Sequence, residues 1–471
     1  MEQEKQKTLY DLIILGGGPA GYYAAERASD AGFRVLMLEE RALGGVCLNE
    51  GCIPTKSLLY AAKLAYSVRH GGDYGVYADN VRLDHAKALE RKNSVVRKLV
   101  GGVATTLKQK SISAIRAYGV VKGKSENGFF VETGGDIYEG ARLLVCTGSE
   151  TIIPPIEGVS EALESGFALT SREILDIGAI PPKLVICGGG VIGLELANYF
   201  CVAGAEVTVV EMLSEVGGPI DSDIAKNLRM NLARLGVRFM LETKVIGMGE
   251  GAVRVLRAGE EESIQADKAL LSIGRKPRIE GAGLETIGLY IDRGAVVTDF
   301  RMRTSVPGVW AAGDVNGKSM LAHTAYREAA VAVNDMAGVK DIMAYDAVPQ
   351  IIYTSPEAAS VGETEMTAAA KGYDFDKAVL PLQYSGRYVA ENAHGDGFAK
   401  MLAERRTGRI LGVHIIGSYA SEIIMSAAVL IGGKWNRESA GRIVYPHPTV
   451  GEVLRDLLVE LNQSLGDGRT K

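Results

Sequence analysis

Two cysteines stand close together in the segment GGVCLNEGCIPTK, residues 44–56. Cys47 and Cys52 are flanked by glycines rather than by a packed apolar run, unlike the other cysteines of the chain. Their spacing is longer than the gap of the usual zinc pair, and no cluster of histidine and cysteine supplies two further ligands. In a reducing compartment, close thiols that bind no metal indicate transient redox or catalytic chemistry.

A second candidate site lies near the C-terminus, in the segment HPTVGE at residues 447–452. His447 and Glu452 have the residue types of a general base and of the carboxylate that orients it. The segment also fits a helix start, because Pro448 suits the first helical position and His447 would cap the turn. An apolar helical face follows, formed by Val450, Val453, Leu454, Leu457, Leu458 and Leu461. Spacing alone leaves both interpretations open.

A repeated pattern predicts the elements that position chemistry in this chain. The segment LIILGGGPAG at Leu12 returns as LVICGGGVIG at Leu184, and each copy predicts a strand, a glycine turn, a helix and a second strand. Each copy ends in an acid, Glu39 or Glu211, roughly 20 residues after its first glycine, as a dinucleotide-binding fingerprint requires. The fingerprint glycines are Gly16, Gly18, Gly21, Gly188, Gly190 and Gly193. We therefore predict two bound dinucleotides.

The acid of the second copy bears on the choice of nucleotide. Glu211 accepts hydrogen bonds from a free ribose diol but repels a 2′-phosphate, and the residues MLSEV after it hold no arginine, so NAD is favoured over NADP. A thiol pair exchanges two electrons and NAD a hydride, so a flavin between them makes chemical sense. A third segment supports a flavin, because Gly313 and Asp314 end a predicted strand and a helix begins near Ala322. Asp314 also suits an ordinary turn.

Composition limits the class of protein. Of 471 residues, 47% are hydrophobic and 23% are charged, which predicts about three domains with sizeable cores. The net charge of −5 and the lack of a basic run argue against nucleic acid or a membrane surface as partner. The N-terminus lacks the apolar core of a secretion signal, and no apolar stretch approaches the roughly 20 residues that span a bilayer. We expect a cytoplasmic protein in which Cys146, Cys187 and Cys201 are buried core residues.

Over nearly its whole length, the chain resembles the FAD-containing pyridine nucleotide–disulfide oxidoreductases. The resemblance is carried by both fingerprints, by GGVCLNEGCIPTK, by AAGDV at residues 311–315 and by HPTVGE. It implies an α/β fold with two Rossmann-like domains, an FAD-binding domain at residues 1–149 and an NAD-binding domain at 150–275. A central domain at 276–347 would complete the FAD site, and an α+β interface domain at 348–471 would form a homodimer.

The resemblance also implies roles for the cysteine segment. Cys47 would be the exchange sulfur that a substrate thiol attacks, Cys52 the sulfur against the flavin, and Lys56 a neighbour of the flavin, paired with Glu195. Residues five apart on a regular helix lie about 7.5 Å apart along its axis, beyond the reach of a disulfide. The segment must therefore be irregular between the two cysteines, where Gly51 supplies backbone freedom.

Contacts to the two nucleotides follow from the same resemblance, position by position. The FAD pyrophosphate is expected at the first three glycines, the adenosine ribose at Glu39, and the ribityl or phosphate region at Asp314. The second three glycines and Glu211 are expected to bind NAD, and Gly274 would close that site. Further residues expected along the FAD are Gly119, Thr147, Gly148, Ser149 and Ala322.

The resemblance implies a dihydrolipoyl group as substrate. The tail CIPTK and Glu211 fit that branch of the family better than the glutathione-type branch, and the end LGDGRTK lacks the cysteine pair of mercuric-ion relatives. Dihydrolipoyl thiols are mostly protonated near neutral pH, so attack on Cys47 needs a base, which favours His447 with Glu452 from the other subunit. The carrier would be a lipoylated protein of a 2-oxo acid dehydrogenase or glycine cleavage complex.

Two departures weaken the match to that branch of the family. Tyr445 stands where many members have a histidine or a small residue, and Gly451 replaces a commoner serine. Two other functions therefore remain open: the reduction of another small or protein disulfide with NAD(P)H, and a scaffold subunit of a multienzyme complex. Turnover of free dihydrolipoamide separates these functions. No metal is expected to take part.

Overall fold

The computed structural model describes residues 9–468 and divides the chain into two compact units. The first unit takes the residues up to Ser57, then Leu89–Ile152 and Gly274–Met343, and the second takes Leu58–Ala88, Ile153–Ile273 and the residues from Ala344. Two helices, α3 (Cys52–Arg69) and α4 (His85–Gln109), belong partly to each unit. The four predicted domains are a finer division than these units and stay a prediction.

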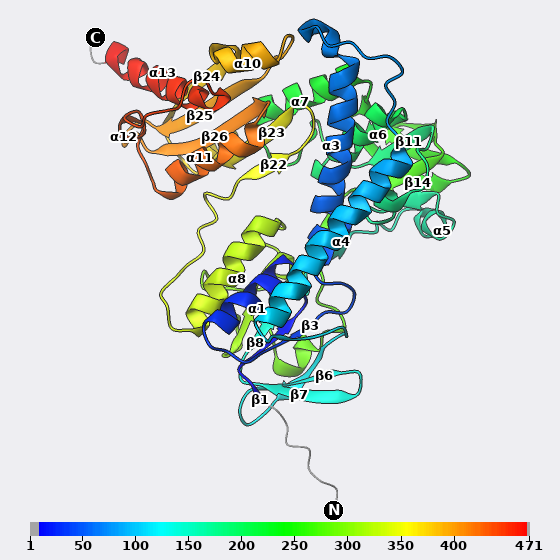
Figure 1. Cartoon of the computed structure of the whole chain (residues 1–471), viewed down its shortest axis with the longest axis vertical. Helices are drawn as coiled ribbons and strands as arrows, with labels where there is room; N and C mark the ends of the chain where they lie inside the picture. The colour runs from blue at the N-terminus through cyan, green and yellow to red at the C-terminus, as the bar shows by residue number, and fades with distance from the viewer. Residues whose placement is uncertain (1–8, 469–471) are drawn as a thin grey trace, which may run out of the picture. The chain divides into compact units, whose positions relative to one another are not determined.

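The first unit is built on a parallel sheet of five strands, β2 (Leu12–Leu15), β3 (Val35–Leu38), β4 (Ser113–Ile115), β8 (Leu143–Val145) and β21 (Val309–Ala311). The strand order is β21-β8-β2-β3-β4, and the three central strands are buried along their whole length, as strands covered on both faces are. Helix α1 (Pro19–Asp30) joins β2 to β3, and α8 (Ala322–Met336) packs beside α1 (Figure 1).

Smaller sheets complete the first unit. A four-stranded sheet holds β1 (Leu9–Tyr10), β5 (Val120–Lys124), β6 (Phe129–Thr133) and β7 (Asp136–Gly140), and an antiparallel pair holds β9 (Ser149–Thr151) and β18 (Arg275–Pro277). One apolar cluster joins the parallel sheet to the four-stranded sheet, with Ile13 and Leu143 from the first and Val121 and Val131 from the second. The same cluster includes Leu15, the last residue of β2 before the glycine turn.

The second unit repeats the first arrangement with another parallel sheet. Its strands are β10 (Ala168–Leu169), β11 (Lys183–Cys187), β12 (Glu206–Val210), β13 (Arg238–Met240) and β17 (Lys268–Leu271), in the order β10-β17-β11-β12-β13. Helix α6 (Val191–Ala203) joins β11 to β12, and α7 (Ser222–Leu235) leads into β13. An antiparallel meander follows, formed by β14 (Thr243–Gly249), β15 (Ala252–Arg257) and β16 (Glu260–Gln265). The predicted pair of strand, glycine turn, helix and strand is therefore confirmed.

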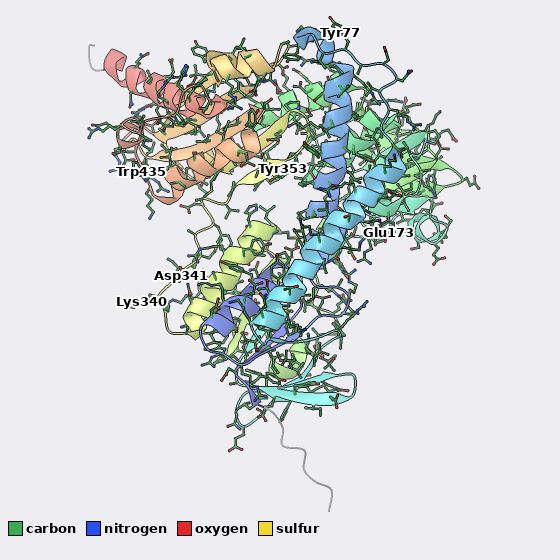
Figure 2. All side chains as sticks on the ribbon, viewed as in Figure 1. Tyr77, Glu173, Lys340, Asp341, Tyr353 and Trp435 are labelled. Carbon is green, nitrogen blue, oxygen red and sulfur yellow. The ribbon has the colours of Figure 1, made fainter. Side chains whose placement is uncertain are left out.

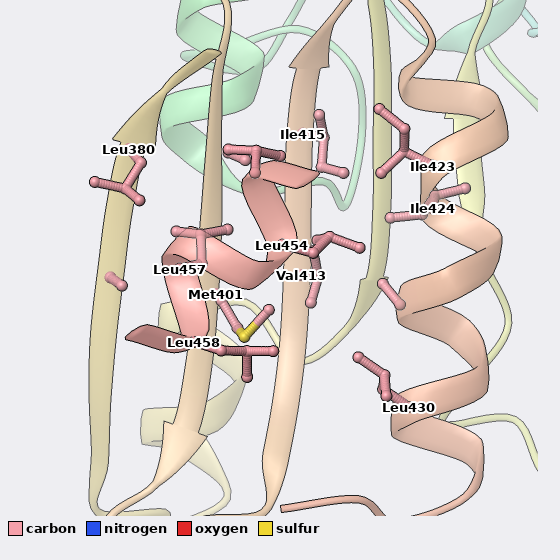
Figure 3. Packing of buried hydrophobic residues seen from close by; sticks show 14 of the residues in the cluster. Leu380, Met401, Val413, Ile415, Ile423, Ile424, Leu430, Leu454, Leu457 and Leu458 are labelled. Atoms are coloured by element: carbon pink, nitrogen blue, oxygen red, sulfur yellow. The ribbon is translucent and has the colours of Figure 1, made fainter. Parts of the chain in front are cut away.

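The C-terminal part of the second unit is an antiparallel sheet covered by helices. The strands are β22 (Gln350–Ile352), β23 (Glu357–Gly362), β24 (Phe375–Pro381), β25 (Phe398–Glu404) and β26 (Ile410–Gly417), and the helices that pack on them are α11 (Ala420–Gly432) and α13 (Val453–Gly468). Figure 3 shows their core, in which Met401 and Val413 from the sheet meet Ile424 of α11 and Leu457 of α13. The apolar face predicted after Thr449 is buried in this core at every position.

A buried lysine of the antiparallel C-terminal sheet reaches the helix that leads into the last strand of the parallel sheet in the second unit. Lys400 of β25 is fully buried, and its Nζ lies 2.9 Å from Asp221 Oδ1 and 2.7 Å from Glu365 Oε1. Asp221 caps α7, and Glu365 begins α9 (Glu365–Ala370). Bonds to three carboxylates raise the pKa of Lys400 above its ordinary value in spite of burial, which alone would lower it. The lysine therefore stays charged.

Candidate functional site

The cysteine segment is interrupted where the sequence predicts it. Helix α2 (Gly45–Glu50) carries Cys47, the backbone breaks at Gly51 with φ −147° and ψ −105°, and Cys52 begins α3. Thr55 Oγ1 donates to Gly51 O at 2.6 Å, which holds the break in place. The side chain of Cys47 hydrogen-bonds to that of Cys52. The break thus brings together two sulfurs that a continuous helix would hold apart.

The thiol of Cys47 is held in its protonated form. Its hydrogen bond to Cys52 and its burial raise the pKa of Cys47 far above the ordinary value, and the charge of Asp314 acts in the same direction. The ammonium group of Lys56 opposes this rise. Both the hydrogen bond to Cys52 and burial therefore oppose loss of the proton from Cys47.

At two positions of the first glycine turn, any residue with a Cβ atom would clash with the backbone. Gly16 has φ +104°, and a Cβ there would lie 2.2 Å from the carbonyl oxygen of Cys146. Gly18 caps the N-terminus of α1, and a Cβ on Gly21 would lie 1.8 Å from Gly16 O. Glu39 Oε2 accepts the backbone N–H of Gly17 at 2.7 Å, so its carboxylate stands at the end of β3 beside the turn. This cradle fits a pyrophosphate with its ribose at the acid.

The second turn repeats this geometry. Gly188 has φ +107°, and a Cβ there would lie 2.6 Å from Ser272 O. Glu211 accepts the N–H of Gly189 at 2.7 Å and that of Leu213 at 2.8 Å. Gly274, which is predicted to close this site, lies in the first unit, so its part in the site stays a prediction. In the second unit, Gly190 caps the N-terminus of α6, and Gly193 packs on Gly188. These residues fit a second dinucleotide with an unphosphorylated ribose.

Asp314 belongs to a partly buried polar cluster with Ser149 and Arg275, and not to an ordinary turn alone. Ser149 Oγ donates to Asp314 Oδ2 at 2.5 Å, and Arg275 Nε donates to Ser149 Oγ at 2.8 Å. Burial raises the pKa of Asp314, while the bond from Ser149 and the charge of Arg275 oppose that rise. Sequence reasoning missed Arg275. The sequence feature that could have identified Arg275 is its position directly after Gly274. Ser149 likewise stands directly after a glycine, Gly148.

The other positions predicted along the FAD lie in the first unit. A Cβ on Gly119 would lie 2.5 Å from Leu38 Cδ1, and Thr147 Oγ1 donates to Arg278 O at 2.5 Å. Ala322 is the first residue of α8, as predicted. Sequence reasoning also missed Glu328, a buried residue of α8 whose Oε2 accepts the N–H of Gly313 at 2.6 Å. Glu328 thereby fixes the backbone next to Asp314.

Lys56 and Glu195 lie in different compact units. Lys56 is on α3 in the first unit, and Glu195 is on α6 in the second. Glu195 is 3% exposed, and its Oε1 accepts the N–H of Tyr353, labelled in Figure 2, at 3.0 Å. The pairing of Lys56 with Glu195 stays a prediction.

The second catalytic candidate forms a histidine–carboxylate pair. His447 Nδ1 lies 2.9 Å from Glu452 Oε2; the side chain of His447 is 72% exposed, whereas that of Glu452 is 3% exposed. A buried acceptor at Nδ1 orients the ring and leaves Nε2 as the outer nitrogen. The alternative in which Pro448 begins the helix is wrong, because Thr449 is extended and the helical turn begins at Val450.

The remaining cysteines are structural. Cys146 and Cys187 are buried, as predicted, and burial raises the pKa of Cys187 to about 12. Cys201 is only partly buried; it lies in the last turn of α6, where its Sγ donates to Leu235 O at 3.3 Å. Among residues 9–468, no group of histidine, cysteine and acidic side chains could hold a metal ion. Over the same residues, no helix has the length and apolar character needed to cross a membrane.

Comparison with known proteins identifies relatives of the whole chain. A family model described as pyridine nucleotide-disulphide oxidoreductase matches residues 10–329, and the model of its dimerisation domain matches residues 348–458. The dihydrolipoyl dehydrogenase of Cupriavidus necator is 36% identical over 470 residues, which cover 96% of this chain and 98% of that protein. The mitochondrial dihydrolipoyl dehydrogenase of Sus scrofa is 36% identical over 460 residues, covering 95% and 89%.

Solved structures share the fold. The crystal structure of LpdA from Mycobacterium tuberculosis superimposes with a TM-score of 0.87 at 24% identity and covers 96% of this chain and 99% of that one. The HOCl-induced flavoprotein disulfide reductase RclA from Escherichia coli gives a TM-score of 0.83 at 27% identity, with coverage of 96% and 99%.

Proposed function

The chain belongs to the pyridine nucleotide-disulphide oxidoreductases, and on that premise we propose that it oxidises protein-bound dihydrolipoyl groups with NAD⁺. The observation that carries the proposal is the cysteine pair, which the break at Gly51 brings together and in which Cys47 hydrogen-bonds to Cys52. Relatives named for the dihydrolipoyl reaction over nearly the full length supply the substrate class.

The exchange begins at Cys47. One dihydrolipoyl thiolate attacks Cys47 Sγ of the Cys47–Cys52 disulfide, so the S–S bond breaks, a mixed disulfide forms at Cys47 and the electron pair leaves on Cys52. The second substrate thiol then attacks the substrate sulfur of the mixed disulfide, which closes the lipoyl ring and releases Cys47. The substrate loses two electrons and two protons. The cysteine pair gains the two electrons, His447 takes the proton of the first thiol, and the released Cys47 takes the proton of the second.

His447 is the base that this exchange requires. Its outer Nε2 takes the proton of the attacking thiol, while Glu452 holds Nδ1 and stabilises the imidazolium. Because Glu452 is buried, its carboxylate keeps the ring in one orientation. We propose that this pair comes from the other subunit of a homodimer, which the match to the dimerisation domain supports.

Two nucleotides complete the enzyme. FAD would be held by the first glycine turn with Glu39, and by Gly119, Thr147, Gly148, Ser149, Asp314 and Ala322. NAD would be held by the second turn with Glu211 and Gly274. A flavin bound there would supply the two-electron relay between the dithiol and NAD⁺. The chain's own contribution is to bind both nucleotides and to exclude a 2′-phosphate at Glu211.

The test is turnover by the purified holoenzyme. Free dihydrolipoamide with NAD⁺ should give NADH, and a lipoylated carrier protein of a 2-oxo acid dehydrogenase or glycine cleavage complex should be the better substrate. The reducing cytoplasm suits such exchange. If dihydrolipoamide is not oxidised while NADH or NADPH reduces another disulfide, the enzyme is a reductase of that disulfide. If neither reaction occurs, the chain is a scaffold subunit.

A further inference from the structure

The histidine–carboxylate pair spans an exposed and a buried part of one segment. Residues 446–448, which include His447, are exposed, whereas Glu452 is a buried residue of the 3₁₀ turn η6 (Val450–Glu452). An exposed segment opens easily unless hydrogen bonds tie it to the buried part of the fold. Thr449 stands between the two parts, in an extended conformation with φ −140° and ψ 154°. The position of His447 relative to Glu452 therefore depends on what holds Thr449.

A serine from another part of the same unit binds the carbonyl group of Thr449. Ser385 is fully buried, and its Oγ donates to Thr449 O at 2.9 Å. Thr449 is also the N-cap of η6, and the carbonyl of an N-cap residue accepts the first hydrogen bond of its turn. On the exposed side, Thr449 Oγ1 donates to Pro446 O at 2.8 Å. The bond from Ser385 thus ties both parts of the segment to the protein core.

Ser385 is itself held in place by the core. Its N–H donates to Leu382 O at 2.9 Å, and its Oγ accepts the N–H of Tyr388 at 3.3 Å. Ser385 thereby caps α10 (Gly386–Glu391), which packs against η6. Leu382 and Tyr388 belong to the apolar core of the antiparallel sheet. A hydroxyl group has one proton to donate, and the proton of Ser385 goes to Thr449.

We propose that Ser385 is a positioning residue for the exchange reaction, which fixes Thr449 so that His447 Nδ1 meets Glu452 and Nε2 stays the outer nitrogen. Without the hydroxyl of Ser385, the carbonyl of Thr449 loses its bond to the core, and the exposed segment is free to move away from Glu452. A general base must lie within hydrogen-bond reach of the proton that it takes, so a displaced ring slows the reaction. The inference rests on the role of His447 as the base proposed above, but not on the identity of the dithiol.

The first test determines the tautomer of His447 by ¹⁵N NMR in the purified holoenzyme, labelled at its six histidines. The spectrum is recorded at about pH 9, at which an ordinary imidazole is neutral, and the spectrum of His447→Gln assigns the signal. In the unchanged protein, the bond to Glu452 should keep the proton of the ring on Nδ1. In Ser385→Ala, the ratio of the Nδ1-protonated to the Nε2-protonated form should fall by about fivefold, since that bond is weakened.

The second test is kinetic. Ser385→Ala should lower kcat for dihydrolipoamide oxidation by about tenfold with little change in KM, because the substrate still binds while the base is misplaced. NADH-driven reduction of an artificial one-electron acceptor should stay unchanged, because that reaction needs no base.

The matched control is Thr364→Val, which removes the capping hydroxyl of another six-residue helix, α9. Thr364 Oγ1 accepts the N–H of Thr367 at 3.1 Å, so its loss weakens a helix start in the same way as that of Ser385. Both the tautomer ratio and kcat of this variant should coincide with those of the unchanged protein.

An unshifted tautomer ratio or an unchanged kcat in Ser385→Ala overturns the proposal, as does an equal shift in Thr364→Val. If Ser385→Ala does not fold, Ser385→Cys decides, because a thiol fills the site but is a weak donor, and an unshifted ratio there also overturns the proposal. The tautomer is determined without substrate. A shifted ratio together with a failed dihydrolipoamide assay of the unchanged protein would therefore contradict the proposed substrate alone.

Discussion

The two glycine turns of this chain share one backbone design and differ in the helix behind it. In both turns the acid after the second strand accepts the N–H of the middle glycine at 2.7 Å, Glu39 from Gly17 and Glu211 from Gly189. Behind the second turn, α6 is buried without interruption from Gly193 to Phe200. Most of α6 therefore serves to pack the protein core.

The first helix keeps part of its surface for other contacts. In α1, Tyr23 and Glu26 are only half-buried, and α8 packs along the helix. The residue after the third glycine is Tyr22 in the first turn and Leu194 in the second. Because the turns are alike, the difference in chemistry arises from these side chains and their neighbours, and the reactive thiols lie beside the first turn.

The strongest test of this difference removes the thiols. Cys47→Ser and Cys52→Ser should each lower dihydrolipoamide oxidation by roughly 10⁴-fold or more, because the covalent exchange has no other sulfur. NADH-driven reduction of an artificial one-electron acceptor, which depends on the second turn and needs no disulfide, should persist. Cys201→Ser is the matched control and should leave both steady-state rates near those of the unchanged protein. Loss of both reactions in Cys47→Ser would show that the two regions are not separable.

Removal of the base should have the next largest effect. His447→Gln should slow dihydrolipoamide oxidation by roughly 10²- to 10⁴-fold, the usual contribution of general acid–base catalysis, and Glu452→Gln by less. The artificial acceptor assay should again be nearly unchanged, because NADH supplies a hydride and requires no base. A parallel fall of both activities together with loss of FAD would make His447 a structural residue.

Matched alanine substitutions distinguish the nucleotide bound at the first glycine turn from that bound at the second. Gly16→Ala introduces a Cβ 2.2 Å from a backbone oxygen at positive φ, and at least about tenfold weaker FAD binding is expected from strain of this kind. Gly188→Ala has the same conflict with Ser272 O and should raise the KM for NADH by about tenfold while FAD content stays normal. FAD absorbance and NADH titration distinguish the outcomes. Equal loss of FAD in both variants would contradict the assignment of one nucleotide to each turn.

The acids of the two turns allow a smaller, more selective test. Glu211→Ala removes the charge that repels a 2′-phosphate, so the preference for NADH over NADPH should narrow by about tenfold. Glu39→Ala should leave this preference unchanged, since its turn binds the other nucleotide. The ratio of kcat/KM for the two reductants measures both. Equal use of NADH and NADPH by the unchanged protein would remove the basis of the NAD assignment.

The smallest expected effect concerns α8, the helix that packs on α1 behind the first glycine turn. Arg327 of α8 donates to Asp341, labelled in Figure 2, at 2.7 Å, and this bond is the main cause that lowers the pKa of Asp341 to about 2. Because the folded pKa lies below the unfolded value, the pair stabilises the fold above about pH 4 and loses this effect as the pH falls toward 2. Asp341→Asn should lower the free energy of unfolding by about 1 kcal/mol at pH 7, since Arg327 is half-exposed and solvent screens the pair.

Urea unfolding at pH 7 and pH 3 checks this prediction. The difference between Asp341→Asn and the unchanged protein should narrow at the lower pH, where Asp341 begins to take up its proton. A difference of the same size at both values would mean that the side chain acts through packing and not through its charge.

The features that the sequence predicted correctly are local ones. The turn at Gly16, the break at Gly51 and the start of α8 at Ala322 follow from residue types within a few positions of each other. Partners that are distant in the chain were not predictable from one sequence. Arg275 reaches Ser149, and Tyr326 reaches Tyr22, only because the sheet and helices bring these segments together. Even the local start of the last helix was misplaced, because an extended Thr449 delays it to Val450.

The buried charge of Lys400 has a consequence for how the second unit unfolds. Lys400 belongs to the antiparallel sheet, and Asp221 caps a helix of the parallel one. If the parallel sheet and its helices unfolded alone, the buried ammonium group of Lys400 would lose its bond to Asp221. An unpaired buried charge is strongly disfavoured. We therefore expect the two layers to lose structure in a single calorimetric transition, with no population in which the nucleotide-binding half persists without its neighbour.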